Sequence, residues 1–398
     1  MAPVFDINRL LAYSTGQRAS DLHLQMDRKP LIRVDGSLRD IEEYPVLDET
    51  AMTQLLQPLL NDDQKKQYRE NKSVDFSHAV PGVARFRVNL FVQQGKMGAV
   101  FRRIPEKIPT LDELAAPAAL LDFAKRPRGL VLVTGPTGSG KSTTLAAALD
   151  AINSTRADHI LTIEDPIEFV HSSKRCLINQ REIGRDCPNF ARGLRDALRE
   201  DPDVILVGEM RDLETMQLAI TAAETGHLVF GTVHTSSAPS AVDRIVDAFP
   251  AAQQQQVRVM LAESLIGVVT QALLPRADGE GRVAAHEVMV VNNPVKNHIR
   301  KQETGHIRSV MQTQTKEGMQ TLDRALVYLV AQNIVAEDVA RGRAQHLTEF
   351  DQLLTRFRRT GELNPPRLVT PGLLAEHLGL ESGGAASEPQ AEAESAGE

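Results

Sequence analysis

The pattern of apolar and polar residues divides the chain into two kinds of region. In the first hundred residues, segments such as 21–26 and 85–92 alternate apolar and polar side chains with a period of two. This alternation is typical of strands that bury one face and expose the other. The other predicted elements are a helix over 7–13, a strand and hairpin turn over 31–36, and a helical region over 48–70 with a break near 58–61. Residues 1–104 are therefore predicted to form a small α+β domain.

Continuous apolar runs replace this alternation in the second region, and helical stretches separate them. The four runs are residues 130–134, 159–164, 204–207 and 228–233. Such runs are typical of strands buried on both faces, so the pattern predicts a mostly parallel sheet covered by helices on either side. The last part of this region is predicted to be helical, with Gln253–Gln256 on an exposed helix face. In sheets of this kind, ligands bind at the carboxyl ends of the strands.

The boundaries of these regions follow from composition. Residues 105–110 are polar and contain two prolines, which predicts a linker. The second domain is predicted to span residues 111–363. Residues 364–398 are predicted to be a C-terminal tail, largely disordered, because the chain carries almost no apolar side chains from about Leu380 onward.

A phosphate-loop motif follows the first buried strand. The sequence Gly-Pro-Thr-Gly-Ser-Gly-Lys-Ser at 135–142 lies between a strand and a helical run, the context in which this motif is meaningful. Its glycines let successive backbone N–H groups turn towards phosphate oxygens, whereas a glycine-rich turn without that role would not need the flanking elements. Lys141 is predicted to reach the β- and γ-phosphates of ATP, and the Ser142 hydroxyl to ligate Mg²⁺. The predicted nucleotide-binding residues are Gly135, Pro136, Thr137, Gly138, Ser139, Gly140, Lys141, Ser142 and Thr143.

Charged side chains follow the other three strands. They are Glu164, Asp165 and Glu168 after the second strand, Glu209 after the third and His234 after the fourth. Each alone is explained as a solvated strand end or a structural histidine, but parallel strands bring their carboxyl ends to one edge. A generic nucleotide site has Asp where Gly208 stands, so Glu209 is predicted to supply the carboxylate for Mg²⁺ or its water.

Composition limits the classes of function. Lys and Arg number 45 against 52 Asp and Glu, a net charge of −7, which argues against a protein that coats nucleic acid and disfavours the alternative of a nucleic-acid translocase. Cys176 and Cys187 cannot make a disulfide framework or a four-thiolate zinc site. No signal-like segment and no apolar stretch of about 18 residues is present, so a cytoplasmic protein that meets the membrane through partners is expected.

The motifs together resemble the PilT family of type IV pilus retraction ATPases, within the secretion ATPase superfamily. The similar segments are residues 19–24, 135–142, 159–171, 194–212 and 224–234, and the match covers about residues 5–345. The resemblance implies a PAS-like N-terminal domain, a RecA-like P-loop NTPase core and a homohexamer that hydrolyses ATP with Mg²⁺ at the inner face of the cytoplasmic membrane. It implies an inner-membrane pilus platform protein as partner, a paralogous accessory ATPase as a further candidate, and no direct nucleic-acid partner.

The resemblance also implies roles for single residues. Glu168 would activate water, Glu164 would shape its surroundings, and Glu209 would hold the Mg²⁺–water network. Arg87 and Arg102, which by spacing alone belong to an ordinary solvated strand face, would reach the phosphates, lent by a neighbouring subunit whose N-terminal domain packs on the next core. Four further residues are implied, Arg195 and Arg199 in support of the arginines and His227 and His234 as sensors of nucleotide state.

Departures from related families bear on the direction of the motor. The tetracysteine insertion and long N-terminal extension of type II secretion and pilus-extension ATPases are missing, which favours retraction. The retraction family's C-terminal signature helix is only partly matched by residues 294–300, whereas residues 318–323 resemble that family. The alternatives are an accessory ATPase similar to PilU and a pilus assembly or secretion ATPase.

Overall fold

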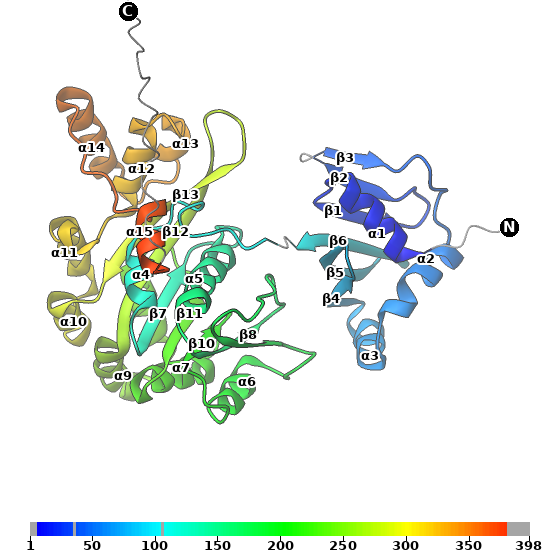
Figure 1. Ribbon diagram of the computed structural model, residues 1–398, viewed down its shortest axis with the longest axis horizontal. Helices are drawn as coiled ribbons and strands as arrows, with labels where there is room; N and C mark the ends of the chain where they lie inside the picture. The colour runs from blue at the N-terminus through cyan, green and yellow to red at the C-terminus, as the bar shows by residue number, and fades with distance from the viewer. Residues whose placement is uncertain (1–5, 35–36, 105–106, 380–398) are drawn as a thin grey trace, which may run out of the picture.

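The structure is a computed structural model that describes residues 6–34, 37–104 and 107–379. Figure 1 shows two units, each built on one sheet, that follow one another along the chain. The predicted hairpin turn at 35–36, the first two linker residues and the tail from Leu380 onward lie outside the described residues. No helix in the described ranges is both long and apolar enough to cross a lipid bilayer.

The first unit is an antiparallel sheet with helices against one face. Its strand order is β3-β2-β1-β6-β5-β4. The strands are β1 Asp21–Gln25, β2 Leu31–Val34, β3 Ser37–Asp40, β4 Ser73–Val80, β5 Ala84–Gln93 and β6 Lys96–Ile104, and the helices are α1 Ile7–Gly16, α2 Glu49–Leu56, the 3-10 helix Gln57–Leu59 and α3 Asp62–Asn71. The period of two places Phe86 and Val88 in the core with Leu10 and Leu55, whereas Arg87 faces outward. The predicted α+β domain is confirmed.

The second unit is a seven-stranded sheet in the order β13-β12-β7-β11-β10-β8-β9. The strands are β7 Gly129–Thr134, β8 His159–Glu164, β9 Leu177–Glu182, β10 Val204–Val207, β11 Leu228–Val233, β12 Leu265–Pro275 and β13 Arg282–Val290. All neighbouring pairs are parallel except β12 and β13. The predicted mostly parallel sheet is confirmed.

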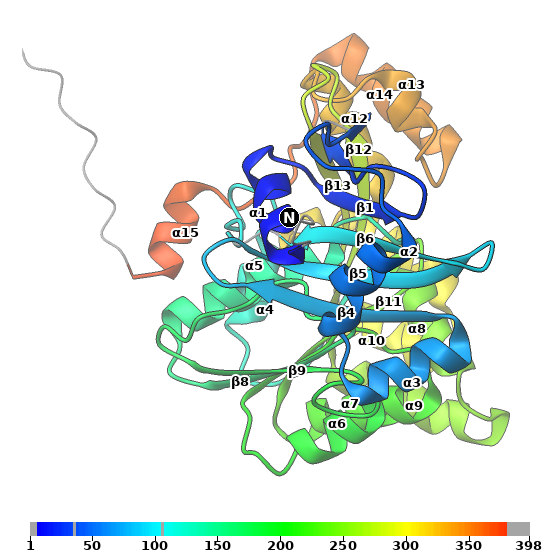
Figure 2. The ribbon, with the colours of Figure 1, turned by 90° about the vertical axis from the view of Figure 1, so that its right-hand side faces the viewer.

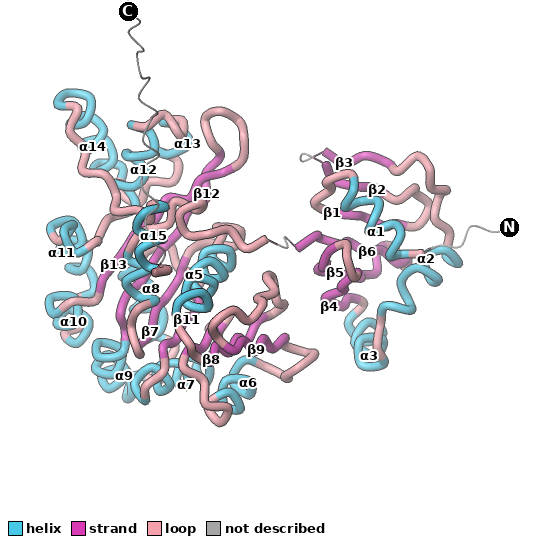
Figure 3. The backbone as a smooth tube through the Cα atoms, in the orientation of Figure 1, coloured by secondary structure: helices cyan, strands magenta, loops and turns pink. Residues whose placement is uncertain are grey.

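Helices cover both faces of this sheet (Figures 1 and 3). They are α4 Ala119–Ala124, α5 Lys141–Thr155, α6 Phe190–Ala197, α7 Leu213–Thr225, α8 Ala238–Asp247, α9 Ala251–Ser264, α10 Asn293–Arg300 and α11 Ile307–Thr313. Alternate residues of β7 point to opposite sides: Leu130 and Leu132 pack with α7, α8 and α9, whereas Val131 and Val133 pack with α4 and α5. Burial on both sides explains why the sequence of these strands is apolar throughout.

The end of the described chain packs around the β12–β13 hairpin and the core. Its helices are α12 Leu322–Ala331, α13 Glu337–Arg341, α14 Leu347–Thr360 and α15 Pro371–His377, with short 3-10 helices at Thr304–His306 and Thr315–Glu317. Helix α15 packs through Leu374 against the cluster that contains Phe123. The prediction of a largely disordered tail is therefore wrong for residues 371–377, because that stretch buries leucines on the core.

The prediction of a helical end to the core domain was partly wrong. Residues 265–290 form a long antiparallel hairpin, and β12 lies beside β7, one strand in from the edge of the sheet. A short apolar run does not distinguish a buried strand from a buried helix, so the pattern could not decide this segment. The exposed glutamines 253, 255 and 256 do lie on a helix, α9, as predicted.

Candidate nucleotide-binding site

The phosphate loop lies between β7 and α5, as its sequence predicted. Gly135, Gly138 and Gly140 have φ angles of 137°, 77° and 88°, a region that other residues rarely adopt. Helix α5 begins at Lys141, so its free N–H groups and the positive end of its dipole face the loop. Lys141 is only 9% exposed, and its Nζ donates to the carbonyl oxygens of Gly135 (2.9 Å) and Pro136 (3.1 Å).

The surroundings of the loop fit a bound phosphate. The Ser139 hydroxyl is buried and has no hydrogen-bond partner among the described residues. Leaving it unpaired would destabilise the fold, unless a ligand accepts a hydrogen bond from it. A Cβ atom at Gly135 would lie 2.3 Å from the carbonyl oxygen of Gln271 on β12, so that position accepts glycine alone. The Gln271 amide oxygen accepts from the Thr144 hydroxyl at 2.8 Å and so ties α5 to β12.

Glu209 follows β10 and therefore lies at the same edge of the sheet as the phosphate loop, which follows β7. Its role towards Mg²⁺ stays a prediction. The preceding Gly208 packs closely on β8, because a Cβ atom there would lie 3.0 Å from the Ile163 carbonyl oxygen and 3.2 Å from the Glu164 Cα. A carboxylate side chain at 208 would therefore be crowded, whereas Glu209 is not subject to this contact. Glu209 Oε1 lies 2.5 Å from Nε of Arg211 and 3.2 Å from Nε2 of His234.

The charges around Glu209 keep it ionised. Burial raises the pKa of Glu209, but the hydrogen bond and charge of Arg211, with the charges of His234 and Lys141, outweigh burial and leave that pKa below its usual value. Burial lowers the pKa of Lys141, while the charges of Glu209 and Glu168 oppose the shift. Lys141 follows β7, Glu168 follows β8 and Glu209 follows β10, so all three residues lie towards the carboxyl edge of this parallel sheet.

The acidic residues after β8 have different environments. Glu164 accepts from the Thr162 hydroxyl (2.7 Å) and the Gln180 amide (3.1 Å), and burial raises its pKa above the usual value despite these bonds. Among the described residues, the Glu168 carboxylate has no hydrogen-bond or ion-pair partner. Glu164 therefore has a structural place in the loop, whereas Glu168 is available to a ligand or a water molecule.

The structure does not bring His227 to this site. It precedes β11, while His234 follows it, so the two histidines lie at opposite ends of the strand, roughly 20 Å apart. His227 Nδ1 lies 2.9 Å from the carbonyl oxygen of Ala222, at the end of α7. Within one chain His227 contacts the end of a helix and not the phosphate loop, so its role as a sensor of nucleotide state stays a prediction.

The two arginines of the α6 region are also away from the phosphate loop. Arg195 pairs with Glu214 at the start of α7, and its side chain is 48% exposed. Arg199, just beyond α6, is exposed. Neither contacts the loop in the described part of this chain, so their supporting role remains a prediction.

Arg85, Arg87 and Arg102 lie on the outward face of the first sheet, which we call the arginine face. Arg87 pairs in register with Arg102, and Arg102 with Asp21. Asp21 is 5% exposed and accepts from Arg102 Nε at 2.8 Å. Figure 1 shows the β4–β5 side of this sheet turned towards the β8–β9 end of the core.

Contacts within one chain join this face to the core. Arg85 Nη2 lies 2.8 Å from Glu182 Oε2 on β9. The charge of Arg87 lowers the pKa of Asp165, although burial, the largest influence, leaves that pKa raised overall. The arginine face thus approaches the acidic loop of its own subunit. The expectation that a neighbour lends these arginines concerns the assembled ring and stays a prediction.

Mg²⁺ fits this site through few protein atoms. In the described part of the chain, no three His, Cys, Asp or Glu side chains come together as a metal site. Mg²⁺ in nucleotide sites commonly keeps several waters and takes one or two protein ligands with the substrate phosphates. The Ser142 hydroxyl at the start of α5 and the ionised Glu209 supply that donor set.

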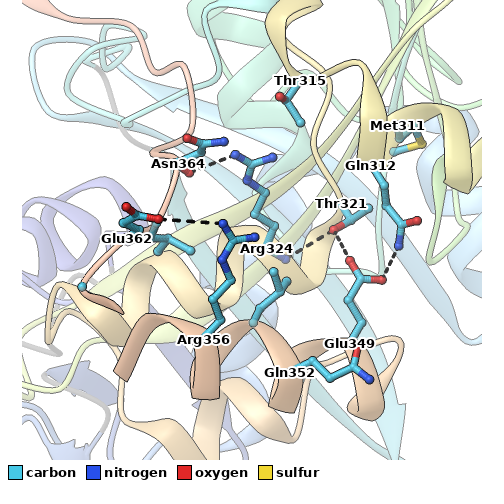
Figure 4. A pocket seen from close by; sticks show the side chains of 13 residues that line it. Met311, Gln312, Thr315, Thr321, Arg324, Glu349, Gln352, Arg356, Glu362 and Asn364 are labelled. Carbon is cyan, nitrogen blue, oxygen red and sulfur yellow. Dashed lines mark hydrogen bonds and ion pairs between the residues drawn. The ribbon is translucent and has the colours of Figure 1, made fainter. Parts of the chain in front are cut away.

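A separate cavity of about 730 Å³ lies between α11, α12, α14 and the segment after α14. In Figure 4, Arg324 reaches across it to Asn364, whose carbonyl oxygen accepts from Arg324 Nη2 at 3.2 Å. Arg356 lies 3.9 Å from Glu362 at its rim. None of its lining residues belongs to the predicted nucleotide site, so this cavity is distinct from it.

Comparison with known proteins places this site in a family. The family model of type II/IV secretion system proteins matches residues 3–347. The chain belongs to that family. It is 55% identical to the type IV pilus retraction ATPase PilT of Pseudomonas aeruginosa over 340 residues, 85% of this chain and 98% of that protein. It is also 55% identical to a twitching motility protein of Neisseria gonorrhoeae, over 80% of this chain and 84% of that protein.

The crystal structure of the pilus retraction motor PilT with bound ADP is similar throughout, with a TM-score of 0.82 and 43% identity over 87% of this chain and 99% of that one. The predicted fold, a RecA-like P-loop NTPase core with a smaller α+β domain, is confirmed. The family and the converging residues make this secretion ATPase an ATP-hydrolysing enzyme.

Several residues that shape the site of this secretion ATPase were not predicted from its sequence. They are Arg211, Gln271, Arg85 and Glu182. Arg211 lies two residues after Glu209, and that spacing was a usable signal. Gln271 and Glu182 lie on β12 and β9, strands that the pattern did not predict, so no local signal pointed to them.

Proposed function

We propose that this protein is a Mg²⁺-dependent ATPase that drives type IV pilus retraction and twitching motility. The observation that supports it is the 55% identity over nearly the whole length of the Pseudomonas retraction ATPase, in a chain whose phosphate loop, Glu168 and Glu209 converge. Lys141 exchanges its bonds to two loop carbonyls for bonds to the substrate phosphates, and the start of α5 stabilises their charge.

Each of the remaining residues has a separate role in the hydrolysis of ATP. Glu168, which is free of protein partners in the described residues, accepts a proton from the attacking water. Ser142 and Glu209 would hold Mg²⁺, which would neutralise charge on the β- and γ-phosphates. Arg87 of the same chain approaches the transferred phosphoryl group when the N-terminal domain closes on the core, and Arg102, bonded to Asp21, follows it. Phosphoryl transfer relies on such positioning and charge stabilisation more than on covalent chemistry.

The assembly follows from the same proposal. Six copies form a ring in the cytoplasm, at the inner face of the membrane, and act on the pilus through an inner-membrane platform protein. Hydrolysis moves the N-terminal domain against the core, and His234, which touches Glu209, reports the nucleotide state to α8 behind it. A paralogous accessory ATPase is a further partner of this ring, and nucleic acid is not a direct one.

The test combines genetics and enzymology. Deletion of the gene in its own organism is expected to abolish twitching and to leave excess surface pili, and the Lys141→Ala gene should not restore motility. Cells without pili would instead indicate an assembly ATPase, and normal twitching would remove the proposal. An isolated protein with no ATPase activity would favour an accessory role similar to PilU, and stimulation by single-stranded DNA would favour a translocase.

A further inference from the structure

Glu182, at the end of β9, is a buried carboxylate that the nucleotide site does not use. Its side chain is 5% exposed. It accepts hydrogen bonds from three segments of the chain: Arg85 Nη2 on β5 at 2.8 Å, the Ser77 hydroxyl on β4 at 2.9 Å and the backbone N–H of Ile167 at 3.2 Å. A buried charge is stable only when it is paired and hydrogen-bonded, and these donors meet that need.

The backbone of Glu182 is held by the turn that follows β9. The N–H of Glu182 donates to Oδ2 of Asp186 at 2.9 Å, and its carbonyl oxygen accepts from the N–H of Asp186 at 2.8 Å. In the parallel β8–β9 pair, Glu182 lies in register with Glu164, where the acidic loop begins. The three donors therefore meet an acceptor that is fixed to the core.

The bonds to Glu182 link two parts of the proposed hydrolysis machinery. Among the described residues, the side-chain hydrogen bonds that β4 and β5 make with the core all end on this carboxylate. Arg85 precedes Arg87 by two residues on the same face of β5, and the Ile167 N–H directly precedes Glu168. A single carboxylate therefore fixes the strand that bears Arg87 relative to the loop that bears Glu168.

We infer that Glu182 is a positioning residue for phosphoryl transfer, which links the strand that bears Arg87 to the loop that bears Glu168 and does not itself touch the nucleotide. The inference rests on the proposed ATPase function. A negative charge is required at 182 because Arg85 is 19% exposed and, among the described residues, has no other carboxylate partner. A neutral acceptor would bind the guanidinium more weakly and would let β5 move away from the acidic loop.

The test is steady-state ATPase kinetics on the full-length protein. Glu182→Gln keeps the size of the side chain and removes its charge, and we expect kcat to fall about 10- to 100-fold, as for a small misplacement of catalytic groups. The KM for ATP and the affinity for a fluorescent ADP analogue should change less than about twofold, because the phosphate loop is untouched. Arg85→Gln should give the same pattern, and the double variant should be no worse than either single one, because both remove the same interaction.

Asp150→Asn provides a matched control. Asp150 forms an ion pair with Lys174, also 2.8 Å long, in which both residues belong to the core domain and lie away from the first sheet. Loss of this ion pair should leave kcat unchanged. An unchanged kcat in Glu182→Gln would overturn the inference. So would a joint loss of kcat, nucleotide affinity and melting temperature, since that pattern indicates a role in folding alone. If wild-type protein did not hydrolyse ATP, the proposed function itself would fail, a result distinct from normal activity in Glu182→Gln alone.

Discussion

The phosphate loop and the arginine face are two parts of one proposed site that are held in different ways. The loop is continuous in sequence, lies between a buried strand and a helix, and is braced by Gln271 from β12. The arginine face belongs to another sheet, joined to the core by a linker and by hydrogen bonds to Glu182. Binding of the nucleotide phosphates thus depends on a rigid local motif, whereas stabilisation of charge on the transferred phosphoryl group depends on a domain that can move. Such a division suits an enzyme that converts hydrolysis into domain motion.

The largest effect is expected from the loop. Lys141→Ala removes the ammonium that meets the β- and γ-phosphates, and ATP turnover should fall by about 10³-fold or more. Circular dichroism and melting temperature should stay near wild type, since Lys141 makes only two hydrogen bonds to loop carbonyls. Lys66→Ala, at an exposed position of α3, serves as the control. Full activity in Lys141→Ala would show that the loop does not act in catalysis.

The arginine face should contribute less to nucleotide binding and more to turnover. Arg87→Ala is expected to lower kcat by about 10²-fold with little change in KM, because its charge acts on the transferred phosphoryl group. Arg39→Ala, on the exposed strand β3, should have no effect. A large rise in KM with normal kcat would instead assign Arg87 to substrate binding.

Mixed rings decide whether the arginine face acts on its own subunit. In rings assembled from Lys141→Ala and Arg87→Ala chains, no subunit has both parts of the site, so activity should stay at background. If the arginine came from a neighbour, as family resemblance suggested, some sites in the mixture would be complete and activity would return. The hydrogen bond between Arg85, two residues before Arg87, and Glu182 of the same chain supports the first outcome.

The two domains should also differ in their response to pH. Burial raises the pKa of Glu287, between the starts of α8 and α12, to about 7, from about 4.5 in an unfolded chain. Its contribution to stability is complete below pH 4.5 and is lost as pH rises through 7, by about 3 kcal/mol in total. Asp21 acts in the opposite sense: burial raises its pKa, but bonds from Arg102 and Ser20 lower it overall, so its contribution is lost in acid.

Urea unfolding of the core at pH 5 and pH 8 measures this difference. The Glu287→Gln variant removes the titration and keeps one oxygen, which accepts from the Ala238 N–H but leaves the Leu322 N–H without its acceptor. Its stability should therefore be lower than that of wild type at pH 5 but should vary less with pH. Equal pH dependence of the two proteins would show that Glu287 does not titrate in this range.

The smallest effect is expected from a substitution at Gly208, which follows β10 and packs against the end of β8. Gly208→Ala adds a methyl group against the backbone of Ile163 and Glu164, which should lower the free energy of unfolding by about 1–3 kcal/mol. Gly16→Ala in α1 of the first domain, where no atom lies within 4 Å of the added methyl, is the matched control. A melting temperature of Gly208→Ala equal to wild type would mean that β8 yields at this edge.

Much of the core could be predicted because its signals are local. Strands 159–164, 204–207 and 228–233 have the predicted bounds, since each buries both faces and carries a continuous apolar run. The hairpin β12–β13 was missed because burial on both sides removes the periodicity that separates a strand from a helix. The two histidines show a related limit: their motif indicates that they flank a strand, but only the structure shows that His227 contacts the end of α7 and not the phosphate loop of its own chain.

By itself, the sequence determined the phosphate loop, the buried strands that flank it along the chain and the acids that follow two of those strands, because these depend on side chains within a few positions of one another. The tertiary structure alone decided which distant groups meet. Glu182 and Arg85 are 97 residues apart and in different sheets, and their bond exists only because the first sheet turns its β4–β5 side towards β9. Figure 2 shows these strands one above the other. The residues next to a charged side chain on an exposed strand face do not indicate its distant partner. Only the packing of the two domains shows which residue that partner is.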